Sequence, residues 1–356
     1  MGVIFSIGTD GANYTVLHKF VGGYDGGANP RDGLIYSGGK LYGGTNYGGD
    51  TSGDNSGNGV VFSFDPNTKD FTVLRRFQES GPDDGENPSG DLTLSGAKLF
   101  GVTQQGGASN WGTIFSVDTD GNNFTLLHEF TNTTTDGSSP YDKLLLSNGL
   151  LYGVGGGGGI DNDGVVYSIS TDGTGFTLLH EFDYDDGANP EGNLVQSGST
   201  LYGMTETAGD NNYGVILSAE TDGSNFSVMR HLSYDDGGHS LGGFTLSGDT
   251  LYGMTWYGGA YGYGTIISIN ITGENFTVVH AFEGSTDDGG YPYGNLTIIG
   301  NTVYGMTYNG GVNNDGIIFK YEPVGDGGGV IPEPSTIILV LLSFLGMISK
   351  HFFKKR

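Results

Sequence analysis

Short apolar runs separated by glycine-rich turns recur along the whole chain. Between Gly192 and Leu232 four of them follow one another, as "GNLVQSG", "TLYGMT", "GVILSAETDG" and "NFSVMRHL". Runs of this length that are bounded by Gly, Asp, Asn and Ser are typical of β-strands. "SGST"-like tetrads join the first run to the second and "TDG" joins the third to the fourth, both short enough for antiparallel hairpins. Each group therefore predicts a four-stranded antiparallel sheet, whose strands we call A to D.

This group of four strands repeats about every fifty residues. Strand B carries Leu-Tyr-Gly or a close variant, which begins at Leu41, Leu99, Leu151, Leu201, Leu251 and Val303, at steps of 58, 52, 50, 50 and 52 residues. Four antiparallel strands repeated in this way describe the blades of a β-propeller, whereas solenoid units are usually shorter or helical. We therefore predict an all-β protein, a β-propeller of six to seven four-stranded antiparallel blades, with a hydrophobic helix at the C-terminus.

The predicted domain boundaries follow the repeat. We assign residues 1–321 to the propeller, 322–330 to a glycine-rich linker and 331–356 to a terminal segment. Within the propeller the repeats are about 2–58, 59–111, 112–163, 164–213, 214–263 and 264–315, with a partial repeat at 316–321.

The chain enters the pattern in the middle of a blade. "GVIFSIGTDGANYTVLHKF" at 2–20 aligns with "GVVYSISTDGTGFTLLHEF" at 164–182, so the first strands are of type C and D. Either residues 2–20 complete the last blade of a six-bladed ring, or the natural start lies upstream and adds a signal peptide and the missing strands of a seventh blade. Closure in either form removes open sheet edges. We expect the second arrangement, in which the start is truncated or misassigned.

Composition agrees with a propeller and excludes some chemistry. Of 356 residues 69 are Gly, 21 Tyr and 20 Phe, as expected for many tight turns between short strands whose rings fill a core. The absence of cysteine excludes disulfides, thiolate metal sites and a cysteine nucleophile.

The charge is strongly negative and unevenly placed. The formal net charge is -26, and the basic side chains of the terminal segment hide how acidic residues 1–330 are. Such a surface repels phosphate backbones, so we predict that nucleic acid is not a partner, while cations and neutral polymers such as polysaccharide remain compatible. Solubility alone also accounts for this charge.

The end of the chain departs from this composition and reads "VIPEPSTIILVLLSFLGMISKHFFKKR" at 330–356. It consists of a Pro332, Glu333, Pro334 motif, an apolar stretch and a basic tail. The predicted membrane residues are Thr336, Ile337, Ile338, Leu339, Val340, Leu341, Leu342, Phe344, Leu345, Met347 and Ile348, and the basic residues are Lys350, Lys354, Lys355 and Arg356. Counted to Phe353, the stretch is just long enough to cross a thin bilayer as a helix, with the basic end in the cytoplasm and the propeller outside.

This order of elements resembles the PEP-CTERM sorting signal of exported bacterial proteins over residues 331–356. The resemblance implies an exosortase-type membrane protease as a partner, recognition near Pro332, Glu333 and Pro334, and removal of the apolar tail. It also implies a protein that is anchored in the membrane before processing and is then delivered to the cell envelope or to an extracellular exopolysaccharide matrix. An ordinary C-terminal anchor is the alternative.

The body of the chain, residues 2–320, resembles the GloVer tandem-repeat proteins. Their units carry a "LYGxT...GG...GxxF" core, and Leu201 to Leu217 have the corresponding order here. The resemblance implies propeller-like repeats, which often precede such sorting tails. Proteins of this class carry an N-terminal signal peptide, which the residues after Met1 do not show.

Several features that could carry chemistry have simpler explanations. "GVGGGG" at Gly153 to Gly158 matches G-x-G-x-x-G, but a loop and a strand follow it, so no helix N-terminus is available for a pyrophosphate. One position of strand D carries an imidazole or a guanidinium in six blades, and we interpret these residues as packing or surface residues: His18, Arg75, His128, His180, Arg230 and His280.

Acidic residues recur in the loops between strands D and A. An Asp precedes Gly in each loop, at Asp25, Asp84, Asp136, Asp186, Asp236 and Asp288. Asp-Gly suits a turn, so we predict turns and no cofactor, with Ca²⁺ as the weaker alternative. The long loop "NYGGDTSGDNSGN" adds a weak calcium hint, since Asp54 to Gly59 with Asp65 approaches an EF-hand pattern.

Aromatic residues gather in the loops between strands B and C, on the rim that also carries the Asp-Gly loops. Flat rings cover the apolar faces of sugars and carboxylates accept hydroxyl protons, so we predict a glycan-binding surface there, with packing among loops as the alternative. Its residues are Trp111, Trp256, Tyr257, Tyr261 and Tyr263, with Tyr213 and Tyr308 in sister loops.

No catalytic constellation is evident in the sequence. Chemistry needs polar residues that differ from blade to blade and meet near the axis, and none stands out. The chain also has no G-x-S-x-G and no H-E-x-x-H. We therefore predict a non-enzymatic binding or structural module exported to the cell surface or matrix, with a polysaccharide hydrolase or lyase on the same scaffold as the alternative.

Overall fold

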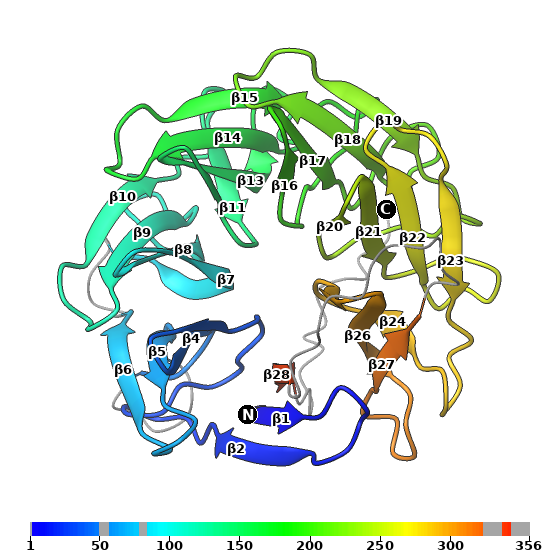
Figure 1. Ribbon diagram of the computed structural model, residues 1–356. Coiled ribbons are helices and arrows are strands. Elements are labelled where there is room, and N and C mark those ends of the chain that lie inside the picture. Colours follow the sequence, from blue (N-terminus) through cyan, green and yellow to red (C-terminus); the bar gives the residue numbers. More distant parts are fainter. Residues whose placement is uncertain (1, 50–56, 78–83, 323–336, 343–356) are drawn as a thin grey trace.

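The computed structural model describes residues 2–49, 57–77, 84–322 and 337–342 of the chain. All regular elements of this part except short turns are strands, and they form antiparallel sheets arranged around a central axis (Figure 1). Six of the sheets have four or five strands, which confirms the predicted all-β propeller of four-stranded antiparallel blades.

The six blades follow one another along the chain, and we number them in that order. Blade 1 consists of β3 (Ile35–Ser37), β4 (Lys40–Thr45), β5 (Val60–Phe64) and β6 (Phe71–Arg76), and blade 2 of β7 (Glu86–Ser95), β8 (Lys98–Gln105), β9 (Thr113–Asp118) and β10 (Thr125–Glu129). Blade 3 contains β11 (Gly137–Pro140), β12 (Leu145–Ser147), β13 (Leu150–Gly158), β14 (Val165–Ser170) and β15 (Thr177–Glu181). Blade 4 contains β16 (Val195–Ser197), β17 (Thr200–Met204), β18 (Val215–Glu220) and β19 (Ser227–His231).

The last two blades complete the series. Blade 5 consists of β20 (Thr245–Ser247), β21 (Thr250–Thr255), β22 (Thr265–Asn270) and β23 (Thr277–Ala281), and blade 6 of β24 (Gly290–Pro292), β25 (Thr297–Ile299), β26 (Thr302–Asn309) and β27 (Ile318–Tyr321). The first strand of each blade lies next to the axis and the last lies outside, as β16 and β19 show in Figure 1. In blades 3 and 6 the inner strand is split in two, and both parts pair with the same neighbour.

A three-stranded sheet lies between blade 6 and blade 1 in the ring (Figure 1). It contains β1 (Gly2–Ile7), β2 (Thr15–Lys19) and β28 (Ile337–Leu342), in the order β2-β1-β28. Residues 2–20 therefore form a sheet with β28 and do not pair with β27, so they do not complete blade 6. Since β1 corresponds to strand C of a blade, β28 pairs with it as strand B pairs with strand C in the six blades.

The predicted C-terminal hydrophobic helix is not supported. Ile337–Leu342 pair antiparallel with β1, from Gly2 opposite Leu342 to Ile7 opposite Ile337. β-Branched residues suit a strand, and the edge of β1 offers unpaired backbone groups to such a segment. The other predicted membrane residues, the Pro-Glu-Pro motif and the basic tail lie outside the described residues. In the described part no helix is long and apolar enough to span a membrane.

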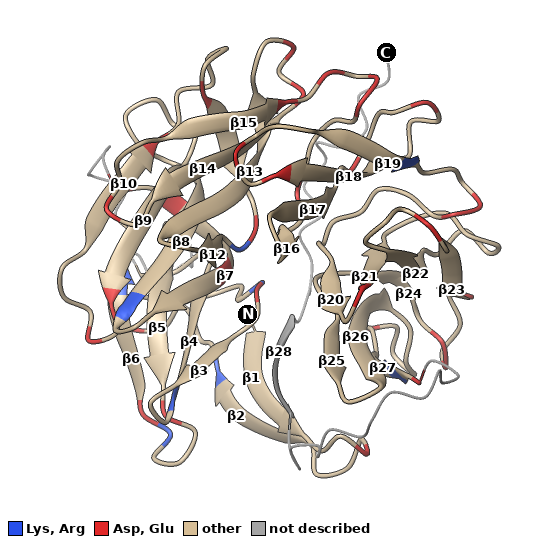
Figure 2. Ribbon diagram, turned by 45° about the horizontal axis from the view of Figure 1, so that its top comes forward, with Lys and Arg blue, Asp and Glu red and all other residues tan. Residues whose placement is uncertain are grey.

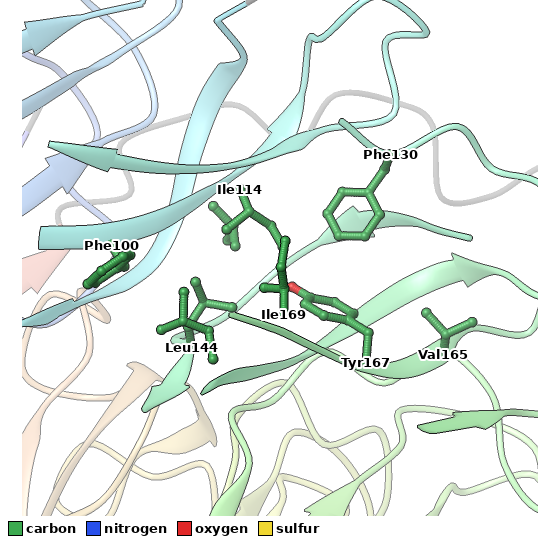
Figure 3. Packing of buried hydrophobic residues seen from close by; sticks show 9 residues of the cluster. Phe100, Ile114, Phe130, Leu144, Val165, Tyr167 and Ile169 are labelled. Atoms are coloured by element: carbon green, nitrogen blue, oxygen red, sulfur yellow. The ribbon is translucent and has the colours of Figure 1, made fainter. Parts of the chain in front are cut away.

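The hydrophobic core lies between neighbouring blades. Phe100 and Ile114 of blade 2 belong to one cluster with Tyr167 and Ile169 of blade 3, and all four are at most 2% exposed (Figure 3). The same kind of cluster joins blades 1 and 2, blades 3 and 4, and blades 4 and 5. A blade between two others thus buries one face against the preceding blade and the other face against the following blade. A single repeat could not bury these faces by itself.

The histidines and arginines of strand D add a second contact between blades. The ring of His180 stacks on Phe226 of the next blade with an interplanar angle of 3°, and Arg230 lies 3.9 Å from the ring centre of Phe276. The loop Asp that follows holds the group in five of the six units, as in the 2.8 Å contact between His180 Nε2 and Asp186 Oδ2, whereas Asp25 pairs with Arg76. Contacts with the next blade confirm the packing role of five residues: His18, Arg75, His128, His180 and Arg230.

Candidate functional site

A cavity of about 440 Å³ lies where the inner ends of the six blades meet. Every blade contributes to its wall, through the residues that precede or begin the inner strand. Its polar lining residues are Arg31, Asp32, Asp91, Tyr141, Asp142, Lys143, Glu191, Asn193, Thr245, Tyr293, Asn295 and Thr297. We call it the axial cavity.

A hexapeptide before each inner strand brings these side chains to the axis. The six segments are "NPRDGL" at 29–34, "NPSGDL" at 87–92, "SPYDKL" at 139–144, "NPEGNL" at 189–194, "HSLGGF" at 239–244 and "YPYGNL" at 291–296. The first residue of each is left-handed, with φ between 49° at Ser139 and 57° at Tyr291. In the last five segments its N–H donates to the previous blade, as from Tyr291 to the carbonyl of Tyr263 at 2.7 Å.

The end of the hexapeptide is anchored in the core. Leu92, Leu144, Leu194, Phe244 and Leu296 are each at most 4% exposed. Because both ends are held, the three residues between them are presented to the axis. These three positions differ from blade to blade, whereas the second position of the hexapeptide is always Pro or Ser and the sixth is always Leu or Phe. The three positions read Arg-Asp-Gly, Ser-Gly-Asp, Tyr-Asp-Lys, Glu-Gly-Asn, Leu-Gly-Gly and Tyr-Gly-Asn.

These polar residues differ from blade to blade and meet near the axis, which is where a site was expected. They do not stand out in the sequence, and the absence of a catalytic constellation stays a prediction. The signal was present in the sequence as variation between a constant Pro or Ser and a constant Leu or Phe. This variation is hard to recognise in the sequence because it directly follows the Asp-Gly loops, whose composition is typical of turns.

Asp142 is the best connected carboxylate of the axial cavity. Its Oδ1 accepts the backbone N–H of Lys143 at 2.6 Å, and its Oδ2 accepts the backbone N–H of Asn193 at 2.9 Å. The Asn295 amide also donates to Oδ2, at 3.4 Å. Asp91 is held in a similar way, because its Oδ1 accepts the backbone N–H of Gly33 from the neighbouring blade.

Burial raises the pKa of every carboxyl group in the cavity wall. The pKa of Asp142 rises to about 6, because burial and the nearby charge of Asp91 outweigh its hydrogen bonds. The pKa of Glu191 rises to about 8, mainly through burial and then through Glu206, against the attraction of Arg31. The cavity therefore holds protonated and ionised carboxyl groups side by side near neutral pH.

The pKa values of Asp32 and Asp91 are raised by burial as well. Burial raises the pKa of Asp32 well above its ordinary value, and the charges of Asp91 and Asp142 add to this. The pKa of Asp91 is also raised by burial, although Lys143 opposes the shift.

Two acceptor atoms in the wall have no partner in the part of the chain that the structure describes. They are Asp32 Oδ2 and Asn193 Oδ1, and both atoms are buried. Buried polar atoms without a partner are rare in native proteins and are costly unless something binds to them. The wall therefore has unused capacity to accept hydrogen bonds.

The predicted glycan-binding residues do not form one surface. Trp256 packs against Tyr291, Tyr293 and Tyr308, with ring centres 5.2, 6.0 and 5.6 Å away. Since Tyr293 also lines the axial cavity, Trp256 lies directly behind the cavity wall. Tyr263 joins the same cluster through Tyr291, at 5.4 Å. We call these five rings the Trp256 cluster.

The remaining predicted residues are not part of the Trp256 cluster, although Tyr257 lies near Tyr291. Tyr257 is 39% exposed and packs against Tyr234, which also contacts Tyr213. Tyr261 and Trp111 are 56% and 41% exposed, respectively. Packing thus accounts for Trp256 and Tyr263, while Tyr261 and Trp111 present free ring surface.

The described part of the chain contains no group of three or more His, Asp or Glu side chains that could hold a metal ion. The EF-hand-like pattern does not fit either, because the whole of β5 separates Gly59 from Asp65. Asp65 Oδ1 instead accepts the N–H groups of Asn67 and Thr68 at 2.8 and 3.2 Å in a turn. Residues 50–56 of that pattern lie outside the described residues.

Acidic residues are spread over the loops of the whole ring, and basic residues are few (Figure 2). The axial cavity repeats this balance, since the carboxyl groups of Asp32, Asp91, Asp142 and Glu191 outnumber the cations Arg31 and Lys143. Fold and cavity together define a β-propeller with a polar axial site.

The chain belongs to the Gloeobacter/Verrucomicrobia repeat family, whose model matches residues 1–217 and, in an overlapping second match, residues 200–331. No curated protein matches it. Among solved structures, a chain from a nidogen/laminin complex is 14% identical, with 78% of this chain and 91% of that chain covered and a TM-score of 0.45. TolB from Acinetobacter baumannii is 12% identical over 77% of this chain and 62% of its own, with a TM-score of 0.47.

Proposed function

We propose that this protein is a non-enzymatic binding module of the bacterial cell envelope that holds matrix polysaccharide at its axial cavity. The observation that carries the proposal is the convergence of blade-specific polar residues on one cavity in an otherwise repetitive molecule. Repetition alone would serve a purely structural ring, whereas six different wall segments are what selective binding requires.

The cavity suits a polyhydroxylated ligand. Asp32 Oδ2 and Asn193 Oδ1 offer buried acceptors, Tyr141 and Tyr293 bring phenol groups to the wall, and a volume of about 440 Å³ falls in the usual range for small-ligand sites. The Trp256 cluster stands behind one wall, and the exposed ring of Tyr261 adds a flat apolar surface on the rim.

The test combines binding and turnover on the full-length protein. A glycan array identifies bound polysaccharides, and a reducing-sugar assay on each bound polysaccharide detects cleavage. We expect binding without release of reducing ends, and weaker binding by Asp32→Ala and Asn193→Ala. The exposed residue Glu274 provides the control, because Glu274→Gln lies outside the cavity and should bind normally. Binding that these two cavity variants leave unchanged would contradict the proposal.

A polysaccharide hydrolase or lyase is the second candidate. It is favoured by Glu191 and Asp142, whose raised pKa values of about 8 and about 6 in one cavity resemble the pairing of a general acid with a second carboxyl group. Release of reducing ends that is lost in Glu191→Gln would replace the first candidate by this one.

The sorting of the protein is a separate part of the proposal. It rests on the order of Pro332-Glu333-Pro334, the apolar stretch and the basic tail, which together suit recognition by an exosortase-type protease at the membrane. We expect a version ending at Val330 to be lost from the envelope fraction, and the mature protein to lack the residues after about the Pro-Glu-Pro motif. An intact mass that includes the whole tail, in a host with such a protease, would refute this part.

A further inference from the structure

We infer that the axial cavity selects sugars that carry a protonated amine, so that its preferred ligand is an amino sugar within a polysaccharide. This inference rests on the proposed function, since it names the ligand class of the same cavity.

The first argument is the negative charge of the cavity wall, considered together with the hydrogen bonds and cations that already stabilise its carboxyl groups. Asp91 faces Lys143 and is held by the Gly33 N–H, and Asp142 accepts two backbone N–H groups and an amide. Asp32 accepts the backbone N–H of Gly90, and Arg31 attracts both Asp32 and Glu191. Four carboxyl groups of the wall therefore share the two cations Arg31 and Lys143, so an excess of acidic groups remains for a ligand to use. A cationic group on the ligand would complement them, and the overall charge of -26 favours the approach of cations.

The second argument is the kind of atom that lacks a partner. Asp32 Oδ2 and Asn193 Oδ1 are both buried acceptors, and they belong to residues of the cavity wall. An ammonium group has three donors and no acceptor, so it suits such atoms without leaving a lone pair of its own unmatched. A hydroxyl group has one donor, and it would bring two lone pairs into a wall that already has an excess of them.

The protonation of Glu191 provides the third argument. The groups that face Glu191 are Glu206, Arg31 and Asp142, with Tyr141 and Tyr293 also nearby. In this setting Glu191 keeps its proton near neutral pH, which limits repulsion in the empty cavity. An ammonium group placed beside it favours the carboxylate, so binding should release this proton to solvent.

The aromatic surroundings favour an amino sugar over a simple alkylamine. Tyr293 is part of the wall and is backed by Trp256, and Leu241 and Leu296 add apolar surface to the cavity. A pyranose ring presents an apolar face to such side chains while its substituents reach the acceptors.

Isothermal titration of the full-length protein with two trisaccharides tests the inference. One is the glucosamine trimer with free amines, and the other is the N-acetylglucosamine trimer, which has the same ring but no charge. At about pH 6 we expect the amine form to bind at least about tenfold more tightly. Titration in two buffers of different ionisation enthalpy should show release of about one proton with the amine form and none with the acetylated form.

Variants locate the effect within the cavity. Glu191→Gln should abolish most of the proton release, and Asp32→Asn should weaken binding of the amine form more than that of the acetylated form. Glu274→Gln is the matched control and should change neither. The comparison of the two trisaccharides on the wild-type protein needs no variant, so the test stands even if a substitution in the wall impairs folding.

Each outcome decides the inference. Tighter binding of the amine form with proton release supports it. Equal binding of both trimers overturns it and leaves the proposed polysaccharide binding intact. Binding of spermidine as tight as that of the glucosamine trimer overturns the preference for a sugar. Binding of neither trimer overturns the inference, and the glycan array then judges the proposed function separately.

Discussion

The side-chain amide of Asn295 donates a hydrogen bond to Asp142 Oδ2 at 3.4 Å, although 153 residues separate the two in the chain. Asn295 belongs to blade 6 and Asp142 to blade 3, so the bond joins blades that are not neighbours. Asn295 Oδ1 in turn accepts the backbone N–H of Gly243 at 2.8 Å. The inner ends of three blades are thereby connected directly beside the axial cavity.

Replacement of Asn295 by Ala should destabilise the protein at neutral pH. The change removes the donor to Asp142 and the acceptor of the Gly243 N–H, and we expect the free energy of unfolding to fall by about 1–2 kcal/mol. The loss should shrink at about pH 5, because the pKa of Asp142 is about 6 and its protonated form depends less on a donor. Urea denaturation at both pH values measures this. Asn67→Ala in an exposed turn is the control, and an equal effect of both substitutions would show that the Asp142 contact is unimportant.

Glu191 should make the protein less stable as the pH rises. Its pKa increases from 4.5 to about 8 on folding, so between these values the folded protein binds a proton that the unfolded chain has released. The free energy of unfolding therefore falls with pH across this window, by at most about 1.4 kcal/mol per pH unit for one group. Glu191→Gln cannot titrate and should remove this part of the slope.

Urea denaturation of wild type and Glu191→Gln between about pH 5 and about pH 8 checks this prediction. The difference between the two proteins isolates Glu191 from Asp142, which contributes in the same direction at lower pH. Glu274→Gln should follow the wild-type curve. Parallel curves for wild type and Glu191→Gln would mean that the carboxyl group of Glu191 is ionised in the folded protein.

Gly242 lies in the hexapeptide before β20, close to the corresponding hexapeptide of the next blade. A Cβ at this position would stand 2.2 Å from the carbonyl oxygen of Gly294 in the next blade, and this backbone atom cannot move without shifting the blade. Gly242→Ala should therefore cost about 3 kcal/mol of unfolding free energy. Gly44→Ala is the matched control, because a Cβ there would meet atoms at 3.9 Å, and it should be nearly neutral. Thermal melting of both variants checks this prediction. Equal melting temperatures of Gly242→Ala and Gly44→Ala would contradict it.

Tyr167 buries a hydroxyl group that has no partner in the described part of the structure. The same position holds Phe62 in blade 1 and Phe115 in blade 2, and all three side chains are 0% exposed. Tyr167→Phe removes the unpaired group without leaving a large cavity, so we expect stabilisation by about 1 kcal/mol. Tyr152→Phe is the control, since its hydroxyl interacts with Thr221 and its loss should not stabilise. A loss of stability in Tyr167→Phe would reveal a partner for this hydroxyl group.

Much of the fold could be predicted from local pattern. The recurring Leu-Tyr-Gly of strand B and the "TDG" hairpins predicted four antiparallel strands per unit, as found in β16 to β19. Such features are visible in the sequence because they depend on neighbours a few residues away. The C-terminal segment was different: length and hydropathy suggested a helix for Ile337–Leu342, and the availability of the β1 edge made it a strand.

The residues of the axial cavity could not be predicted from the sequence. The large aromatic residues of the loops suggested a binding surface, but Trp256 and Tyr263 pack against other rings. In the sequence, Asp32, Asp142 and Glu191 do not differ from other acidic residues of polar loops. Only in the axial cavity are these carboxyl groups buried together, which raises their pKa values.

The sequence by itself determined the repeat, the strands, the strongly acidic balance and the family, because each of these is a property of the residue order. Only the tertiary structure decided which polar residues meet. Closing the blades into a ring brings Asp142 within 3.4 Å of Asn295 and removes Glu191 from most of the solvent, and such distances and burial do not exist in an open chain. The chemistry of the axial cavity follows from that closure, since desolvation and charge proximity set the protonation of its carboxyl groups.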